Sequence, residues 1–306
     1  METIVIETPT EAFKPAPNVY PTIKESWGFL GWYLLVSLVV GVPVFLLGEK
    51  LLSLPPAVAL LLVVVAGNGT LLWFLRRQHS GRWLGINLHG QVPNWLIMAL
   101  PVMVLAADMI LSLIDLLHLP ALSSDTYHKL LKLPVVAFLI LCVAAPVLEE
   151  LLLRGVLLQG LLRNFPGRPW VAIGQSALIF GLMHANPPQS LATFLLGLLM
   201  GWLYYRTRSL WLCMGVHFLN NLFAFTAMLA TTKTTKEEDV TAMFGTPWIY
   251  AAVVIVSALV LAGLLWRVHK TTVLPEAAGS ADTPETFEVV AVARIVSEES
   301  VEKSSW

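Results

Sequence analysis

The sequence is poor in charge and in cysteine. Only 13% of its 306 residues are charged and 57% are hydrophobic, whereas a soluble domain has about 25% charged and about 45–50% apolar residues. This balance excludes a disordered protein and argues against a soluble enzyme. The net charge of −1 excludes a nucleic-acid binder that relies on bulk positive charge. The two cysteines, Cys142 and Cys213, lie inside apolar runs, so we expect small buried residues and no disulfide framework.

Long apolar runs make up most of the chain. A helix of about 20 apolar residues crosses a bilayer, and eight runs approach that length. They cover Trp27–Gly48, Leu54–Leu75, Trp95–Leu117, Pro134–Arg163, Pro169–Asn186, Ser190–Tyr205, Leu210–Ala230 and Pro247–Val268. Tryptophan and tyrosine lie at several edges of these runs, which is typical of membrane interfaces. The sequence therefore predicts an all-α, polytopic transmembrane helical bundle with about eight spanning helices.

Basic residues are distributed unevenly over the two sides of such a bundle. With eight spans, fourteen of the 19 lysines and arginines lie on the side that carries both chain ends, and five lie on the other side. Because lysine and arginine favour the cytoplasmic side, we expect both termini in the cytoplasm. Residues 1–26 have no basic segment followed by a cleavage site, so we expect no signal peptide. Residues 271–306 are polar and acidic, and we interpret both ends as flexible tails.

The fourth run contains three ionisable residues. Such residues cost about 2.5–3.5 kcal/mol each inside a membrane, so each is a candidate functional residue. Glu150 and Arg154 are four residues apart and share a helix face, so we expect an ion pair with a structural role. Glu149 points about 100° away from Glu150 and has no partner on its own helix. It is therefore our candidate general base.

Polar residues of two other runs are predicted to meet this pair. His184 ends the fifth run, and His217 and Asn221 are four residues apart in the seventh. His217 and Asn221 can both donate hydrogen bonds, as an oxyanion clamp does, although interhelical hydrogen bonds are an alternative use. At about 1.5 Å per residue, Glu149 and His184 lie about 21 and 24 Å from the cytoplasmic ends of their helices, and His217 and Asn221 about 12 and 18 Å. The groups are therefore expected at similar depth.

Two further features of the spans have a structural interpretation. Gly197 and Gly201 form a GxxxG pattern in the sixth run, which predicts close helix packing beside the polar cluster. Asp108 in the third run has no partner that the sequence identifies, so it is either a second polar centre or the partner of a distant arginine. Asp115 is close enough to the end of that run to contact water.

These motifs resemble those of the CPBP family, which contains the type II CAAX prenyl endopeptidases and the bacterial Abi or bacteriocin-processing proteins. The resemblance is in Glu149-Glu150-xxx-Arg154, Phe180-xxx-His184 and His217-xxx-Asn221, with a family-typical segment at residues 201–211. It implies a hydrolase of peptide bonds in a membrane-associated or lipidated protein. In the glutamate-dependent interpretation, Glu149 and His184 activate water, His217 and Asn221 hold the oxyanion, and no cofactor is required.

The resemblance also sets the expected organisation and location. We divide the chain into an N-terminal tail (1–26), three transmembrane helices (27–133), a catalytic core of four helices (134–230), a loop with the last helix (231–270) and a C-terminal tail (271–306). The expected partners are the lipid bilayer and a peptide or membrane-protein substrate, with no nucleic acid. The expected location is a bacterial plasma membrane.

Four alternatives remain open from the sequence. A zinc-dependent version of the protease would use Glu149, His184 and His217 as metal ligands, although the chain has no HExxH motif. A serine protease would use Ser176, which lies in a short rhomboid-like segment. A proton-coupled transporter also uses intramembrane carboxylates and histidines, but the two halves show no repeat. A non-catalytic scaffold or immunity protein is the fourth alternative.

Overall fold

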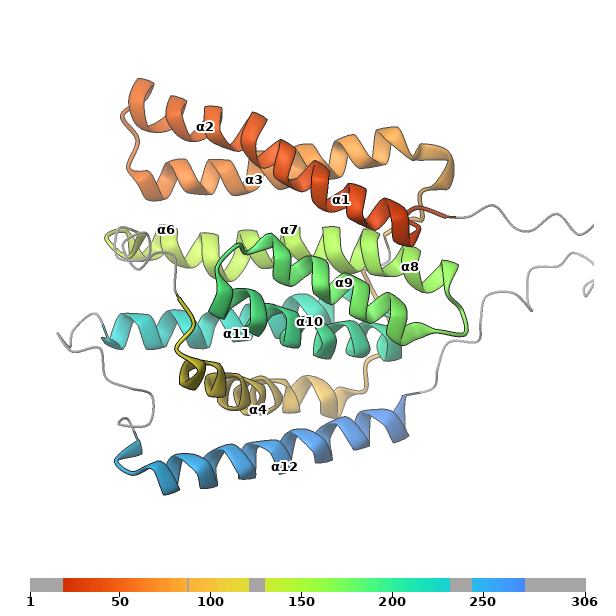
Figure 1. The fold of residues 1–306 in the computed structure, drawn as a ribbon, viewed down its shortest axis with the longest axis vertical. Helices are drawn as coiled ribbons and strands as arrows, with labels where there is room; N and C mark the ends of the chain where they lie inside the picture. The colour runs from red at the N-terminus through yellow and green to blue at the C-terminus, as the bar shows by residue number, and fades with distance from the viewer. Residues whose placement is uncertain (1–18, 87, 121–129, 232–243, 273–306) are drawn as a thin grey trace, which may run out of the picture.

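The computed structural model describes residues 19–86, 88–120, 130–231 and 244–272. Within these ranges the regular secondary structure is helical throughout, which confirms the all-α prediction. The long helices run roughly side by side and form a bundle (Figure 1). Residues 273–306 of the predicted C-terminal tail and residues 1–18 of the predicted N-terminal tail lie outside the described residues.

The helices begin and end close to the predicted spans. The first span is one continuous helix made of α1 (Ile23–Val36), η1 (Ser37–Gly41), α2 (Val42–Leu46) and η2 (Leu47–Leu51). It is followed by α3 (Pro56–Gln78), η3 (Ser80–Arg82), α4 (Asn94–Leu111) and η4 (Ser112–Leu117). The fourth span combines α6 (Pro134–Phe138), η5 (Leu139–Ala144), α7 (Ala145–Glu150), η6 (Leu151–Leu158) and α8 (Gln159–Asn164). The remaining helices are α9 (Pro169–Met183), α10 (Pro187–Thr207), α11 (Leu210–Thr231) and α12 (Pro247–Thr271).

Six of the eight expected spans are long and apolar enough to cross a membrane by length and composition, counted over the described residues. The other two form helices as well, but they differ from a typical span. α9 has only 15 residues, and α10 is less apolar because it includes polar residues such as Gln189, Ser190, Thr193 and Arg206. α9 and α10 pack against each other, and their connecting turn stops well short of the N-terminal end of α6 (Figure 1).

The N-terminal tail ends earlier than predicted. α1 begins at Ile23, because Thr22 and Glu25 form a capping box at its first turn. Glu25 also accepts hydrogen bonds from Arg82, with a shortest distance of 2.7 Å. Tyr20 is buried and stacks on His79 with ring centroids 3.7 Å apart. Residues 19–26 are therefore packed against the bundle, which corrects the boundary of the flexible tail at residue 26.

Glycines bring α9 and α10 into close contact, as the GxxxG pattern predicts. A Cβ atom at Gly197 would lie 3.1 Å from the Cα and Cβ atoms of Ala177, and one at Gly201 would lie 3.0 Å from Ile173. Larger residues at these positions would therefore push the two helices apart. The close approach places the α10 backbone next to the fourth span, where the charged residues lie.

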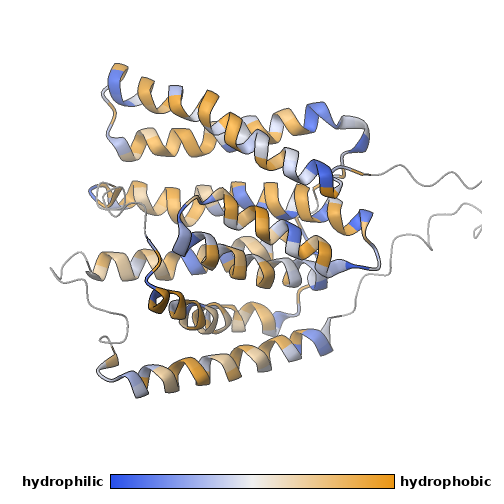
Figure 2. Ribbon diagram, in the orientation of Figure 1, coloured by the Kyte–Doolittle hydropathy of each residue, from blue (hydrophilic) through white to orange (hydrophobic). Residues whose placement is uncertain are grey.

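The outer surface of the bundle is apolar, as expected in lipid. Large side chains such as Leu38, Met98 and Leu259 are exposed. Hydrophobic residues cover the middle of the helices and hydrophilic residues gather toward their ends (Figure 2). Exposed tryptophans such as Trp170 and Trp248 lie at helix ends, where interfacial aromatic residues are common. The chain is thus a multi-pass membrane protein.

Candidate active site

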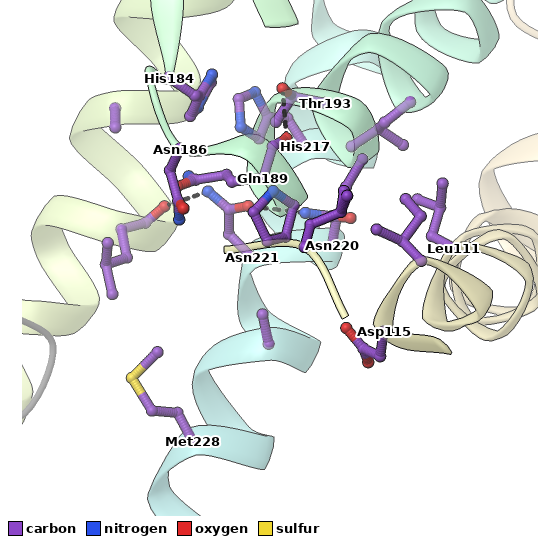
Figure 3. A pocket seen from close by; sticks show the side chains of 18 of the residues that line it. Leu111, Asp115, His184, Asn186, Gln189, Thr193, His217, Asn220, Asn221 and Met228 are labelled. Carbon is purple, nitrogen blue, oxygen red and sulfur yellow. Dashed lines mark hydrogen bonds between the residues drawn. The ribbon is translucent and has the colours of Figure 1, made fainter. Parts of the chain in front are cut away.

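The four predicted catalytic residues line one cavity. Glu149 from α7, His184 at the end of α9, and His217 and Asn221 from α11 all line a cavity of about 790 Å³. Figure 3 shows His184, His217 and Asn221 around this cavity. Its remaining wall comes from α4, η4, η5 and the first half of α10. Three separate helices therefore bring their polar groups to one cavity.

Glu150 and Arg154 form the predicted ion pair beneath this cavity. The Glu150 Oε1 and Arg154 Nη1 atoms are 2.7 Å apart, and the two side chains are 0% and 1% exposed. Arg154 also donates a hydrogen bond to the Gly197 carbonyl at 3.4 Å and lies over the Phe180 ring. The pair thus ties the fourth span to α9 and α10. Arg154 is buried within the bundle, so it should not be counted among the cytoplasmic basic residues.

The helix that carries both glutamates is locally widened. π-helical segments flank α7 on both sides, at Leu139–Ala144 and at Leu151–Leu158. Such segments are rare and frequently occur at functional sites. Arg154 lies in the second of these segments, and it still forms the contact with Glu150, four residues before it.

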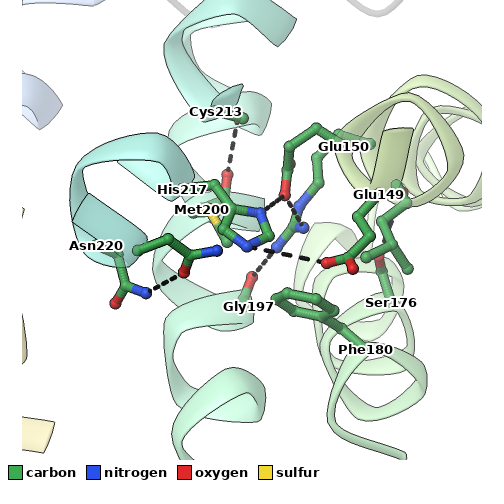
Figure 4. Close-up of polar contacts among 12 residues, drawn as sticks. Glu149, Glu150, Ser176, Phe180, Gly197, Met200, Cys213, His217 and Asn220 are labelled. Carbon is green, nitrogen blue, oxygen red and sulfur yellow. Dashed lines mark hydrogen bonds and ion pairs between the residues drawn. The ribbon is translucent and has the colours of Figure 1, made fainter. Parts of the chain in front are cut away.

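His217 contacts both glutamates through opposite edges of its ring (Figure 4). Its Nδ1 lies 3.0 Å from Glu150 Oε1, and its Nε2 lies 3.8 Å from Glu149 Oε2. With Glu150 as a carboxylate, Nδ1 carries a hydrogen and donates it. The Nε2 edge is therefore directed toward Glu149, at a distance longer than a hydrogen bond. The sequence did not identify this link between Glu150 and His217.

His184 lies on the other side of Phe180. Its Nδ1 is 3.0 Å from the Phe180 carbonyl oxygen. The Phe180 ring centroid is 5.1 Å from that of His184 and 5.7 Å from that of His217. Phe180 thus packs edge-on against both histidines.

Asn221 is held by the backbone of the neighbouring helix. Its Nδ2 donates a hydrogen bond of 2.7 Å to the Leu141 carbonyl oxygen. Its Oδ1 accepts one of 2.8 Å from Asn220. Asn220 also lines the cavity, but sequence reasoning did not select it. Its position beside Asn221 was the signal that could have done so.

The residues proposed for the two alternative protease chemistries are placed differently. In the part of the chain that the structure describes, no three His, Cys, Asp or Glu side chains are grouped so that they could hold a metal ion. Glu149, His184 and His217 are thus not gathered into such a group in this arrangement. Ser176 is buried, donates a hydrogen bond to the Leu153 carbonyl at 3.4 Å and does not line the cavity. Its role is in helix packing.

The two cysteines are buried and free, as predicted. Cys213 donates a weak hydrogen bond to the Met200 carbonyl, with 3.6 Å between the sulfur and the oxygen. Neither cysteine lines the cavity. Both therefore act as packing residues.

Comparison with known proteins matches part of the chain to a family model. Residues 131–223 match the family model described as type II CAAX prenyl endopeptidase Rce1-like. The matched segment begins before α6 and ends within α11, so it contains all four cavity residues discussed above. No curated protein and no solved structure matches the chain.

Proposed function

We propose that the chain is an intramembrane protease of the CPBP family and that it hydrolyses a peptide bond of a membrane-associated or lipidated protein. The match of residues 131–223 to the type II CAAX prenyl endopeptidase Rce1-like model supports this proposal. The observation that carries this proposal is the single cavity lined by Glu149, His184, His217 and Asn221. Four polar side chains from three helices are costly inside an apolar bundle unless they serve a function.

In the proposed mechanism Glu149 and His184 hold the attacking water. Glu149 takes a proton from this water as its oxygen bonds to the scissile carbonyl carbon, and the carbonyl electrons move to oxygen. Asn221 and His217 hold the resulting oxyanion, His217 as an imidazolium that donates from Nε2 while its Nδ1 donates to Glu150. When the intermediate collapses, the carbon–nitrogen bond breaks and the proton passes from Glu149 to the departing amine. The buried Glu150 orients His217 by accepting the hydrogen bond from its Nδ1. A buried aspartate orients the catalytic histidine of serine proteases in the same way.

The test of the proposed function is a comparison of cleavage products. Membranes that contain the wild type or Glu149→Gln are compared by N- and C-terminal proteomics. New peptide ends that appear only with the wild type would identify the substrates. The same pair of proteins, purified in lipid nanodiscs, is then assayed on a fluorescence-quenched peptide with and without an attached prenyl group. Absence of any difference in both assays would contradict the proposal and favour a non-catalytic scaffold or a transporter.

The proposed chemistry requires no metal. A substitution of His217 distinguishes this metal-free mechanism from a zinc-dependent one. As an oxyanion donor, His217 can be replaced by asparagine with partial activity, because the loss of a whole donor costs roughly a hundred- to thousandfold. We therefore expect chelators to leave activity unchanged and His217→Asn to remain measurably active. Metal analysis of both purified proteins provides the check. Stoichiometric zinc in the wild type that disappears in His217→Asn would overturn this prediction.

We further propose that both termini are cytoplasmic. Without Arg154, thirteen of the remaining lysines and arginines still lie on the side of the termini and five on the other. A reporter fused after Val268 should therefore read as cytoplasmic, and one fused after Leu119 as extracytoplasmic. The opposite pattern would invert the topology. In the proposed orientation the cavity residues His118, Asn186 and Met228 lie in the outer half of the bundle, which favours a scissile bond in that half.

A further inference from the structure

Asp108 is a membrane-embedded acid that the proposed mechanism does not use. It lies on α4, outside the segment that matches the family. Its Oδ1 is 2.9 Å from one end of the Asn220 side-chain amide. Its Oδ2 is buried and has no hydrogen-bond partner. Among the described residues Asp108 forms no ion pair, so neither an arginine nor a lysine explains its presence.

Asp108 is the first member of a chain of polar groups that leads to the cavity. The other end of the Asn220 amide lies 2.8 Å from Asn221 Oδ1, and Asn221 Nδ2 lies 2.7 Å from the Leu141 carbonyl oxygen. The groups are thus connected in the order Asp108, Asn220, Asn221 and Leu141. Asn220 and Asn221 lie on the cavity wall, where Figure 3 shows them next to each other.

The Leu141 carbonyl at the end of this series of hydrogen bonds determines which group donates and which accepts in each bond. A carbonyl oxygen can only accept, so Asn221 must direct its NH₂ group toward Leu141 and its oxygen toward Asn220. Asn220 must then direct its NH₂ group toward Asn221. This leaves the Asn220 oxygen 2.9 Å from Asp108 Oδ1. Two oxygens at that distance attract each other only if one of them carries a hydrogen.

If the Asn220 amide is turned the other way, a repulsive contact between two oxygens remains. An ionised Asp108 would accept from the Asn220 NH₂ group, but the Asn220 oxygen would then face Asn221 Oδ1 at 2.8 Å. Turning Asn221 as well would remove this contact, but it would place two oxygens 2.7 Å apart at Leu141. The bond of 3.3 Å from the Asn221 backbone N–H that this orientation gains is long for a hydrogen bond. An ionised carboxylate would also leave a buried oxygen unpaired, which is costlier than leaving a neutral one.

We propose that Asp108 is a neutral carboxylic acid that positions Asn221 for catalysis. Its O–H donates to Asn220, which in turn donates to Asn221. Asn221 is thereby held with its oxygen away from the oxyanion position, and the second hydrogen of its NH₂ group remains free for the cavity. Asp108 does not line the cavity, so it acts as a positioning residue. This inference rests on the proposed oxyanion role of Asn221.

Two substitutions at Asp108 test its positioning role through the hydrogen bond to Asn220. Asparagine has the same shape and offers an NH₂ donor to Asn220, so Asp108→Asn should retain kcat within about threefold of the wild type. Leucine offers no donor, so Asp108→Leu should lower kcat by about 10- to 100-fold, less than the roughly hundred- to thousandfold loss of a whole oxyanion donor. KM should stay unchanged in both, because the substrate itself is not contacted. The quenched peptide in nanodiscs is the probe.

A second pair of measurements tests whether Asp108 influences kcat through Asn220. Asn220→Leu should lower kcat as much as Asp108→Leu does. The double variant should be no slower than either single variant, because both remove the same relay. Multiplied losses in the double variant would contradict the relay. Equal kcat losses in Asp108→Asn and Asp108→Leu would contradict a neutral acid.

Infrared spectroscopy tests the protonated acid independently of activity. The wild type should show a carboxylic acid C=O band, assigned to Asp108 by its loss in Asp108→Asn with the rest of the spectrum unchanged. Absence of such a difference would overturn the proposal, even if Asp108→Leu fails to fold. If the band is present but no substrate is cleaved by the wild type, the neutral acid stands and the proposed protease function fails.

Discussion

Replacing Glu149 by glutamine is expected to lower the rate of peptide hydrolysis by about a hundred- to ten-thousandfold, the usual contribution of a positioned general base. Glutamine has nearly the same shape but cannot take a proton from water. The Glu149 side chain lines the cavity and is 16% exposed, so it remains accessible to water. The measurement is kcat on the quenched peptide in nanodiscs.

The same substitution should leave the fold intact. Glu149 contacts His217 only at 3.8 Å, so its replacement removes no short hydrogen bond. We expect the thermal unfolding temperature to stay close to that of the wild type. Glu49→Gln, the same chemical change on η2 away from the cavity, is the matched control and should retain full activity. An active Glu149→Gln would remove the general base from the proposed mechanism.

The helices could be predicted from the sequence because apolar runs and their prolines are local signals. Pro56, Pro134, Pro169 and Pro247 each begin a helix in the structure, as proline at a first turn predicts. The short α9 could not be recognised as different, because the length of its run did not show that the helix stops at Met183. The N-terminal boundary was missed because the burial of Tyr20 depends on residues some sixty positions away in the chain.

The site could be predicted where its contacts are local and not where they join separate helices. The pair of Glu150 and Arg154 follows from helical spacing alone. The bond from Glu150 to His217 crosses between α7 and α11, and no spacing rule reveals it. The partner of Asp108 was hidden for the same reason, since Asn220 is 112 positions away. The rise per residue along each helix could place the polar side chains at a similar level, but it could not show which of them form hydrogen bonds with each other.

Glu150 is the most heavily committed of the buried polar residues. Its Oε1 receives hydrogen bonds from Arg154 at 2.7 Å and from His217 at 3.0 Å. Its Oε2 and the Arg154 Nε have no partner among the described residues. The ion pair is therefore incompletely satisfied, and its retention is best explained by the orientation of His217. Removing a single charge leaves the other buried without compensation.

Glu150→Gln is therefore expected to destabilise the fold by about 3–5 kcal/mol, the cost of breaking a buried ion pair on one side. Steric-trap unfolding in bicelles measures the free energy. The double variant Glu150→Gln/Arg154→Met removes both charges and should recover most of this stability, because an uncharged pair leaves no buried charge. It should nevertheless remain slower than the wild type, because His217 has lost the carboxylate at Nδ1. A stable but inactive Glu150→Gln beside an active Glu149→Gln would reverse the roles of the two glutamates.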